Sequence, residues 1–323
     1  MISRLAFTVF LLVLAAAPSR AFAIQEVTSP GGIKAWLVED HSIPLIAMSF
    51  SFQPGSAADP AGKSGVANFL TGMMDEGAAD LDSAQFQKRR DALGMRLSFD
   101  AGLDYFEGTF QTLTRNQDGA FDLLRKAITA PRFAAEPIDR MRQSFLLGIS
   151  EKRDDPQQIA FKAWMNLALP GDPYAIESAG TPEAVAAISA QDLKDAHRRI
   201  FNRAALQVSV VGDIDAASLA VRLDKIFAEL PKGAVQEIAV VRPISATASV
   251  KILSRDIPQS IIVFGLAGLK RDDREFIPAY IMSEILGGGG FNSWLTDEIR
   301  EKRGLTYGVN AGFSPLRRLA LQS

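Results

Sequence analysis

The sequence predicts an α+β protein, in which helices pack on an antiparallel-rich sheet. Segments with the alternating period of strands are mixed with segments that have the helical period. Two strand-like segments, 95–101 and 105–113, are separated only by Gly102, Leu103 and Asp104, which predicts a hairpin. A doubly wound parallel sheet needs a long crossover between successive strands, so adjacent hairpins favour the α+β class.

Turn residues and periodicity predict the elements of the first part of the chain in order. Pro54 and Gly55 end one strand, and the following helix places Ala67, Leu70 and Met73 close to one face. The expected strands are 35–39, 45–52, 95–101, 105–113 and 205–211. The expected helices are 64–75, 83–93, 117–128, 137–153, 181–200 and 215–227.

After an irregular stretch at 233–249, the pattern of the first part begins again. Ile257 and Pro258 before an apolar strand at 261–266 echo Ile43 and Pro44, which lie 214 residues earlier. A helix at 278–286 follows, as the helix at 64–75 does in the first part. Two unrelated units could also produce this echo by chance. If the echo is a duplication, the second domain is truncated, and the strand pattern at 316–322 favours a fragment over an abbreviated domain.

The composition excludes a nucleic-acid binder that relies on bulk charge. The chain has 35 Lys and Arg against 37 Asp and Glu, a formal net charge of −2, whereas phosphate contacts need a basic surface. It has no cysteine, which excludes disulfides, thiolate metal ligands and a cysteine nucleophile. We interpret His41 and His197 as structural histidines, and the adjacent Asp75 and Glu76 as solvated carboxylates at a helix end.

The N-terminus predicts export. Arg4 precedes an apolar run at 5–17, and the small residues Ala21 and Ala23 flank Phe22, as at a signal-peptidase site. An uncleaved anchor needs roughly 20 apolar residues, so we expect cleavage after Ala23 and no stable membrane insertion afterwards. The alternative, a retained interfacial anchor, is slightly favoured by Arg20. We expect a periplasmic protein.

A segment from Gly65 to Gly77 resembles the zinc helix of the insulinase/pitrilysin metallopeptidases, which contains His-x-x-Glu-His and an apolar stretch that ends in glycine. The resemblance covers essentially the whole mature chain. It continues in the family's order through 130–133, 154–156, 172–174, 180–182, 211–213 and 286–307.

The resemblance implies two homologous α/β-roll domains. The expected organisation is a signal peptide at 1–23, a metallopeptidase-like domain with a degenerate zinc site at 24–232, a linker at 233–249, and a partial second domain at 250–323.

In that family two histidines and a distant glutamate bind zinc, and the glutamate of the motif acts as a base on the zinc-bound water. Carried over residue by residue, Asn68 stands at the first histidine, Thr71 at the base and Gly72 at the second histidine. The distant glutamate lies eight residues before a proline such as Pro156, which places Gly148 there. We therefore predict that this chain has no catalytic residue and binds no zinc.

The second half retains residues that the resemblance assigns to substrate. Arg300 and Tyr307 match an Arg/Tyr pair that the family directs at the substrate near the zinc. The alternative is that Arg300 lies on a solvated helix face and Tyr307 is a core aromatic. Four glycines precede this pair, and we predict that they form a turn that binds substrate. The alternative is a flexible turn between two helices. These glycines are Gly287, Gly288, Gly289 and Gly290.

Two functions remain from these observations. The resemblance implies a chain that is inactive alone and serves as the non-catalytic subunit of an exported heterodimer, whose partner holds the zinc and cleaves peptides. The alternative is a stand-alone peptide-binding or scaffold protein. An active hydrolase with a different site is a third reading, for which no nucleophile arrangement stands out.

Overall fold

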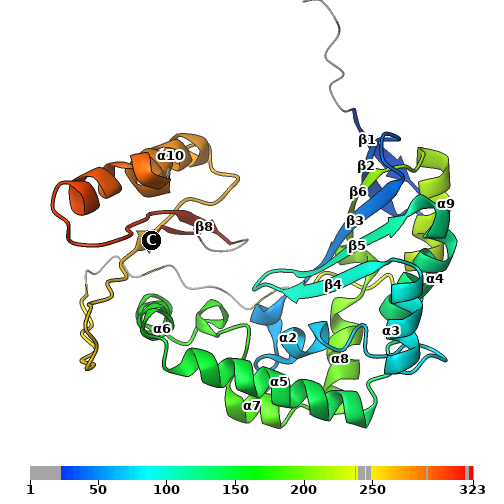
Figure 1. Cartoon of the computed structure of the whole chain (residues 1–323), viewed down its shortest axis with the longest axis horizontal. Helices are drawn as coiled ribbons and strands as arrows, with labels where there is room; N and C mark the ends of the chain where they lie inside the picture. Colours follow the sequence, from blue (N-terminus) through cyan, green and yellow to red (C-terminus); the bar gives the residue numbers. More distant parts are fainter. Residues whose placement is uncertain are drawn as a thin grey trace, which may run out of the picture.

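The computed structural model describes residues 23–236, 238, 244, 249–288, 290–316 and 320–322 (Figure 1). The first unit, residues 24–227, is built on a six-stranded sheet in the order β1-β2-β6-β3-β5-β4. Its strands are β1 (Ile24–Thr28), β2 (Lys34–Glu39), β3 (Leu45–Phe52), β4 (Arg96–Ala101), β5 (Phe106–Leu113) and β6 (Gln207–Gly212).

The sheet is mixed but mostly antiparallel. β2 and β6 form the parallel pair, with Trp36 opposite Ser209, and the neighbouring pairs in this sheet are antiparallel. β3 lies between β5 and β6 and alternates strictly, so that Ile46, Met48 and Phe50 are buried. The α+β prediction is confirmed.

Helices cover one face and one end of this sheet (Figure 1). α3, α4 and α9 lie along the face, and α2, α5, α7 and α8 gather below one end of the strands. The helices are α2 (Val66–Thr71), α3 (Ser83–Ala92), α4 (Gln117–Thr129), α5 (Ala135–Arg153), α6 (Pro156–Ala168), α7 (Pro182–Ala186), α8 (Ala190–Ile200) and α9 (Ala216–Phe227).

Local capping corrects two predicted helices. The segment 181–200 is two helices, because Ser189 forms a capping box with Asp192 and starts α8 anew. The segment 64–75 is helical only at α2, since Gly65 has a positive φ of 89° before it and turns follow Gly72.

A cluster of phenylalanines forms the centre of the first unit. Phe52 packs at 4.6 Å from Phe201 and 6.5 Å from Phe227, measured between ring centroids. Phe50 lies against Gly108 of the neighbouring strand, where a Cβ atom would collide with the ring. Burial of these rings stabilises the packing of the helices on the sheet.

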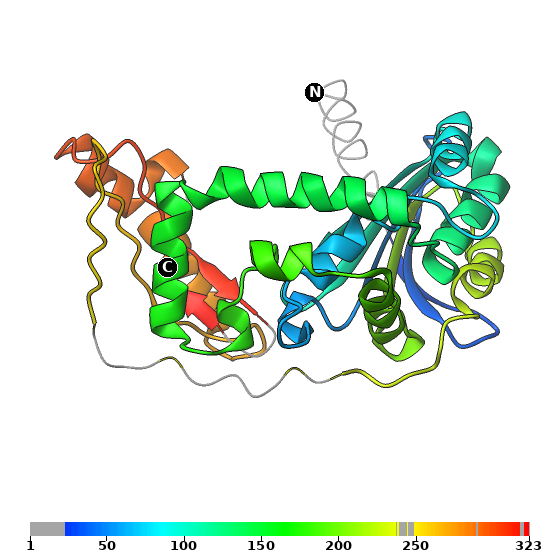
Figure 2. The same ribbon diagram turned by 90° about the horizontal axis from the view of Figure 1, so that it is seen from below.

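A long helix leads from the first unit towards the second (Figure 2). α5 is 19 residues long and is followed by α6, which starts at Pro156 after the capping residue Asp155. Met165 of α6 belongs to a small second cluster, together with Leu169, Tyr174 and Ile238, against which Leu316 packs.

The second unit has a three-stranded sheet in the order β7-β9-β8 and one α-helix among its described residues. Its elements are β7 (Leu266–Ala267), β8 (Phe313–Pro315), β9 (Ala320–Gln322), α10 (Phe276–Ser283) and the π-helices Glu284–Gly288 and Thr296–Glu301. The predicted strand at 261–266 was wrong except at Leu266, because β9 pairs only with Leu266 and Ala267 there.

Sequence reasoning missed β1 and α6. The predicted signal peptide lies outside the described residues except for Ala23, and the predicted linker is described only at 233–236, 238, 244 and 249. Within the part of the chain that the structure describes, no helix is long and apolar enough to cross a membrane.

Candidate functional site

Asp59 fixes the start of α2, the helix that was matched to the zinc helix. Its carboxylate accepts hydrogen bonds from the backbone N–H groups of Gly65 at 2.9 Å and Ala67 at 3.3 Å. It also pairs with Arg199 of α8 at 3.3 Å. Only 4% of the Asp59 side chain is exposed, and this burial raises its pKa to about 6 despite the opposing effect of Arg199.

The three positions on α2 carry no set of metal donors. Asn68 and Thr71 are half-buried, and the Thr71 hydroxyl donates a hydrogen bond to the backbone carbonyl of Asn68 at 2.7 Å. Gly72 caps the helix and has no side chain. A threonine hydroxyl committed to its own helix cannot act as a base near neutral pH.

Side chains of the facing helix α5 pack against the position at which the resemblance implies a zinc ligand. A Cβ atom on Gly72 would lie 3.0 Å from Cε2 of Phe145 and 3.2 Å from the Met141 sulfur. Gly148, one turn after Phe145, has open space around it. These positions therefore do not fit a zinc ion.

The two histidines lie elsewhere. His197 in α8 is half-buried, donates from Nε2 to the carbonyl of Ile128 at 2.7 Å and stacks on Phe201, and partial removal from water lowers its pKa. His41 donates from Nδ1 to Asp213 at 2.7 Å at the surface, which raises its pKa. Across the described ranges, no group of three or more His, Cys, Asp or Glu could hold a metal ion.

The carboxylates at the end of the matched segment are structural. The prediction that Asp75 and Glu76 are solvated was wrong, because Glu76 is buried, pairs with Arg140 of α5 and accepts a hydrogen bond from Ser83 at 2.5 Å. Asp75 pairs with Arg90 of α3 at 2.9 Å, and burial raises the pKa of Asp75. Both groups join helices and contact no catalytic group.

In the second unit, the Arg/Tyr segment is accessible. Tyr307 is 88% exposed, so the alternative of a core aromatic was wrong. Arg300 lies in the second π-helix, with its guanidinium carbon 4.6 Å from the centre of the Phe291 ring. This distance is typical of a cation–π contact, which holds the guanidinium in place.

The glycine turn is described at Gly287, Gly288 and Gly290, whereas Gly289 lies outside the described residues. Gly287 is buried, and a Cβ atom on it would collide with the backbone of Ala311. At Gly287 the backbone is therefore approached by Ala311 of the same chain and not by a substrate. Gly290 has a φ of +64° and nothing within 4 Å of the Cβ atom that it lacks, so another chain can approach the backbone at this position.

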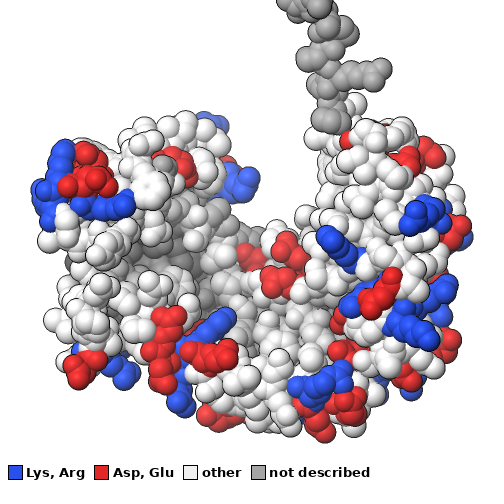
Figure 3. Space-filling view, viewed as in Figure 1, with Lys and Arg blue, Asp and Glu red and all other residues white. Residues whose placement is uncertain are grey.

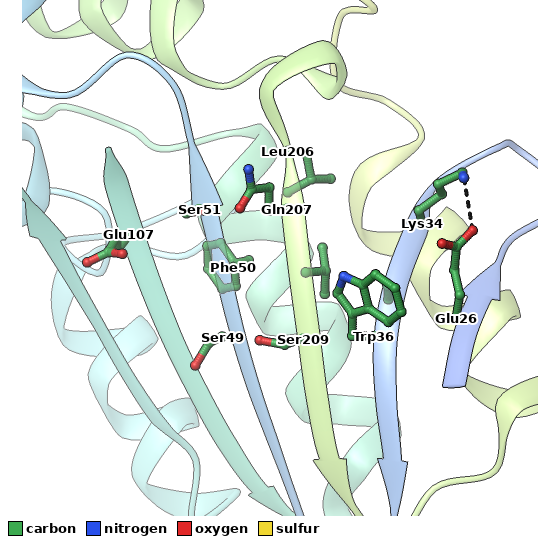
Figure 4. Close-up of a pocket in the computed structure, with 12 residues that line it drawn as sticks. Glu26, Lys34, Trp36, Ser49, Phe50, Ser51, Glu107, Leu206, Gln207 and Ser209 are labelled. Atoms are coloured by element: carbon green, nitrogen blue, oxygen red, sulfur yellow. Dashed lines mark hydrogen bonds and ion pairs between the residues drawn. The ribbon is translucent and has the colours of Figure 1, made fainter. Parts of the chain in front are cut away.

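A shallow groove of about 380 Å³ crosses the face of the main sheet opposite α3, α4 and α9 (Figure 4). Trp36 stands beside Ser209 in it, Ser49 lies on the other side of Ser209, and the ion pair between Lys34 and Glu26, at 2.9 Å, closes one side. None of the positions matched to the zinc motif lines this groove. On the face shown in Figure 3, basic and acidic side chains are interspersed, in keeping with the near-zero net charge.

Fold and site together define a chain with the architecture of a zinc metallopeptidase domain but without histidine or glutamate at the positions matched to the zinc ligands. Two models of one peptidase family match its sequence, insulinase (peptidase family M16) over residues 35–181 and the peptidase M16 inactive domain over residues 187–321. The chain belongs to the insulinase (M16) family, as the resemblance predicted.

Curated relatives are distant in sequence. The non-peptidase homolog YmxG of Helicobacter pylori is 24% identical over 271 residues, which cover 84% of this chain and 62% of the relative. An uncharacterized zinc protease of Rickettsia bellii is 22% identical over 270 residues, which cover 84% of this chain and 65% of that protein. The matched part of this chain thus spans less than two thirds of either relative.

Solved structures share the fold. A peptidase M16 inactive domain from Pseudomonas fluorescens has a TM-score of 0.83 and 26% identity, over 93% of this chain and 73% of that one. A protease from Helicobacter pylori has a TM-score of 0.78 at 19% identity, over 94% of this chain and 74% of that one, which shows the fold alone.

Sequence reasoning identified the positions that lack zinc ligands, but it missed the residues that pack at those positions. Phe145 is an ordinary apolar helix position in the sequence, and only its packing on Gly72 reveals its role. Asp59 follows a turn with no motif around it. One signal was available, since Gly72 is a glycine within an otherwise regular helical pattern.

Proposed function

We propose that this chain is the non-catalytic subunit of an exported, heterodimeric zinc metallopeptidase. Its partner would be a homologous chain with an intact His-x-x-Glu-His motif, which holds the zinc and the catalytic base. This chain would supply Arg300 and Tyr307 to the substrate. The complex would act on peptides in the periplasm.

One observation carries the proposal: the first unit has no histidine or glutamate at the matched positions, while the second unit keeps an accessible Arg/Tyr pair. A guanidinium can hold a peptide carbonyl or carboxylate, and a phenol can donate to the oxyanion that forms at a scissile carbonyl. The name of the Helicobacter pylori relative, a non-peptidase homolog, supports the absence of activity in the chain alone.

Co-purification tests the partner. A tagged copy expressed in its own host should retain a chain that carries the zinc motif, and the pair should cleave an unstructured fluorogenic peptide. The isolated chain should do neither, and it should hold no zinc after dialysis. Recovery of one tightly bound zinc per isolated chain would contradict the proposal.

Substitutions in the reconstituted heterodimer test the roles of the pair. Arg300→Ala or Tyr307→Phe should each lower turnover about a hundredfold, the usual cost of one lost oxyanion donor, while the zinc content stays constant. Arg303→Ala and Tyr280→Phe are matched controls at exposed positions of the same unit and should leave turnover unchanged. Normal turnover in both test variants would rule out the assigned roles.

A second candidate function is a stand-alone peptide-binding protein, favoured by the groove beside Trp36. A pool of fluorescent random decapeptides should then bind the isolated chain, as measured by anisotropy. Trp36→Ala should abolish this binding, and Trp294→Ala, which removes an exposed tryptophan of the second unit, should not. Peptide binding without any zinc-bearing partner would favour this function over the first.

A further inference from the structure

Gly72 is not required by its own backbone. Its φ of −74° and ψ of −5° lie in the right-handed helical region, which any residue adopts. The three nearest atoms that a Cβ atom would meet belong to α5, at 3.0 and 3.2 Å in the Phe145 ring and at 3.2 Å for the Met141 sulfur. Packing against α5, and not chain conformation, explains the glycine.

Phe145 is held in this place from a second direction. Its ring stacks on Phe69 of α2, with centroids 5.2 Å apart and an interplanar angle of 29°. Phe69 is 1% exposed, and the Arg142 guanidinium lies 5.7 Å from the centre of its ring. Arg142 in turn donates hydrogen bonds to the carbonyls of Val185, Ala186 and Ile188 beside α7. The Phe145 ring has little freedom to move off Gly72.

Gly148 presents the opposite case. It lies on α5 one turn after Phe145, and nothing approaches within 4 Å of the Cβ atom that it lacks. A side chain fits there without rearrangement. The position matched to the distant zinc ligand is therefore open, whereas the position matched to the second histidine is closed.

We infer that Phe145 and Gly72 form an apolar lock, which joins α2 to α5 where a metal ion would join the same helices in a zinc-binding relative. The zinc site is therefore lost in two ways: its ligands are absent, and the Phe145 ring occupies the space that a ligand at position 72 would need. Restoring the side chains alone places an imidazole at position 72 against the Phe145 ring, so the metal site cannot form until that ring is removed.

A thermal double-mutant cycle tests the lock without any metal. Gly72→Ala should lower the melting temperature in the native background, because its Cβ meets Phe145, and should raise it or leave it unchanged beside Phe145→Ala. Phe145→Leu serves if the alanine variant does not fold. Gly148→Ala is the matched control and should raise the melting temperature slightly in both backgrounds. Equal effects of Gly72→Ala in both backgrounds would overturn the inference.

Zinc binding gives a second, independent readout. The combination Asn68→His, Thr71→Glu, Gly72→His and Gly148→Glu should hold no zinc after dialysis, although it carries the full ligand set. Adding Phe145→Ala to these four should yield about one zinc per chain, with a tetrahedral absorption spectrum when Co²⁺ is the probe. Equal zinc content in the four-substitution and five-substitution variants, at about one per chain, would show that the ring is no obstacle.

Discussion

The first unit and the second unit use the same kinds of elements but bury them to very different extents. In the first unit, the apolar residues of the strands and helices form one continuous core, in which Phe52, Phe69 and Leu70 are almost fully buried. In the second, apolar residues of comparable pattern are open to solvent, and most of the large hydrophobic side chains that the structure describes as exposed lie after residue 249. Ile262 is 80% exposed and Ile277 is 61% exposed.

The difference shows that periodicity creates an apolar face but does not bury it. α3, α4 and α9 close the face of the first sheet, whereas α10 is the one α-helix among the described residues of the second unit. An apolar face is stabilised only when a second layer removes it from water. The stability of the molecule should therefore reside in the first unit, and four predictions test this.

The largest effect should come from the phenylalanine cluster. Phe52→Ala removes a fully buried ring and should lower the free energy of unfolding by about 3–5 kcal/mol in urea denaturation followed by circular dichroism. Ile262→Ala, its counterpart in the second unit, should change it by less than about 0.5 kcal/mol. Equal losses at both sites would remove the contrast between the units.

The next effect is a pH dependence that arises from Asp59. Its pKa of about 6 in the folded protein lies above the usual 3.8, so the folded state binds the proton more tightly, and the resulting stability is lost as pH rises from about 4 to 6. The full difference is about 3 kcal/mol. Asp59→Asn, which keeps an oxygen for the N–H of Gly65, should flatten this part of the curve. An unchanged pH curve would mean that Asp59 titrates normally.

His197 should act in the opposite direction. Burial lowers its pKa in the folded protein, so stability is lost as pH falls below about 6.5, where the unfolded chain takes up the proton. His197→Gln should remove this loss and lower stability at pH 7 by about 1 kcal/mol, because the bond to the Ile128 carbonyl changes. His41→Gln, at an exposed histidine, is the comparison of opposite sign, because Asp213 raises the pKa of His41 and the stability that this histidine contributes is lost as pH rises. If both substitutions alter the pH curve equally, burial is not the cause.

The smallest effect should come from surface ion pairs of the second unit. Lys302 lies 2.8 Å from Asp297 and 2.6 Å from Glu298, which raise its pKa, yet both ion pairs are exposed to solvent. Lys302→Ala should leave the unfolding midpoint unchanged at physiological salt. A clear shift of the midpoint would show that the second unit contributes to the cooperative transition.

Most elements of the first unit were predictable because they follow local patterns. The strand at 45–52 was predicted with its observed bounds, and the helix at 83–93 ends within one residue of α3. β1 was missed because Gln25 and Glu26 hide its alternation, and it becomes a strand by pairing with β2. The division between α7 and α8 depends on the Ser189 cap, which an apolar period does not reveal.

The sequence by itself determined what this chain lacks: it has no cysteine, and positions 68, 72 and 148 carry neither an imidazole nor a carboxylate, because side-chain identity alone settles which donor groups are present. Tertiary structure decided what stands in their place. The Phe145 ring on Gly72, the buried carboxylate of Asp59 on Arg199 and the exposure of Tyr307 all depend on which distant segments meet. Such contacts are set by the packing of whole layers, so no local period encodes them.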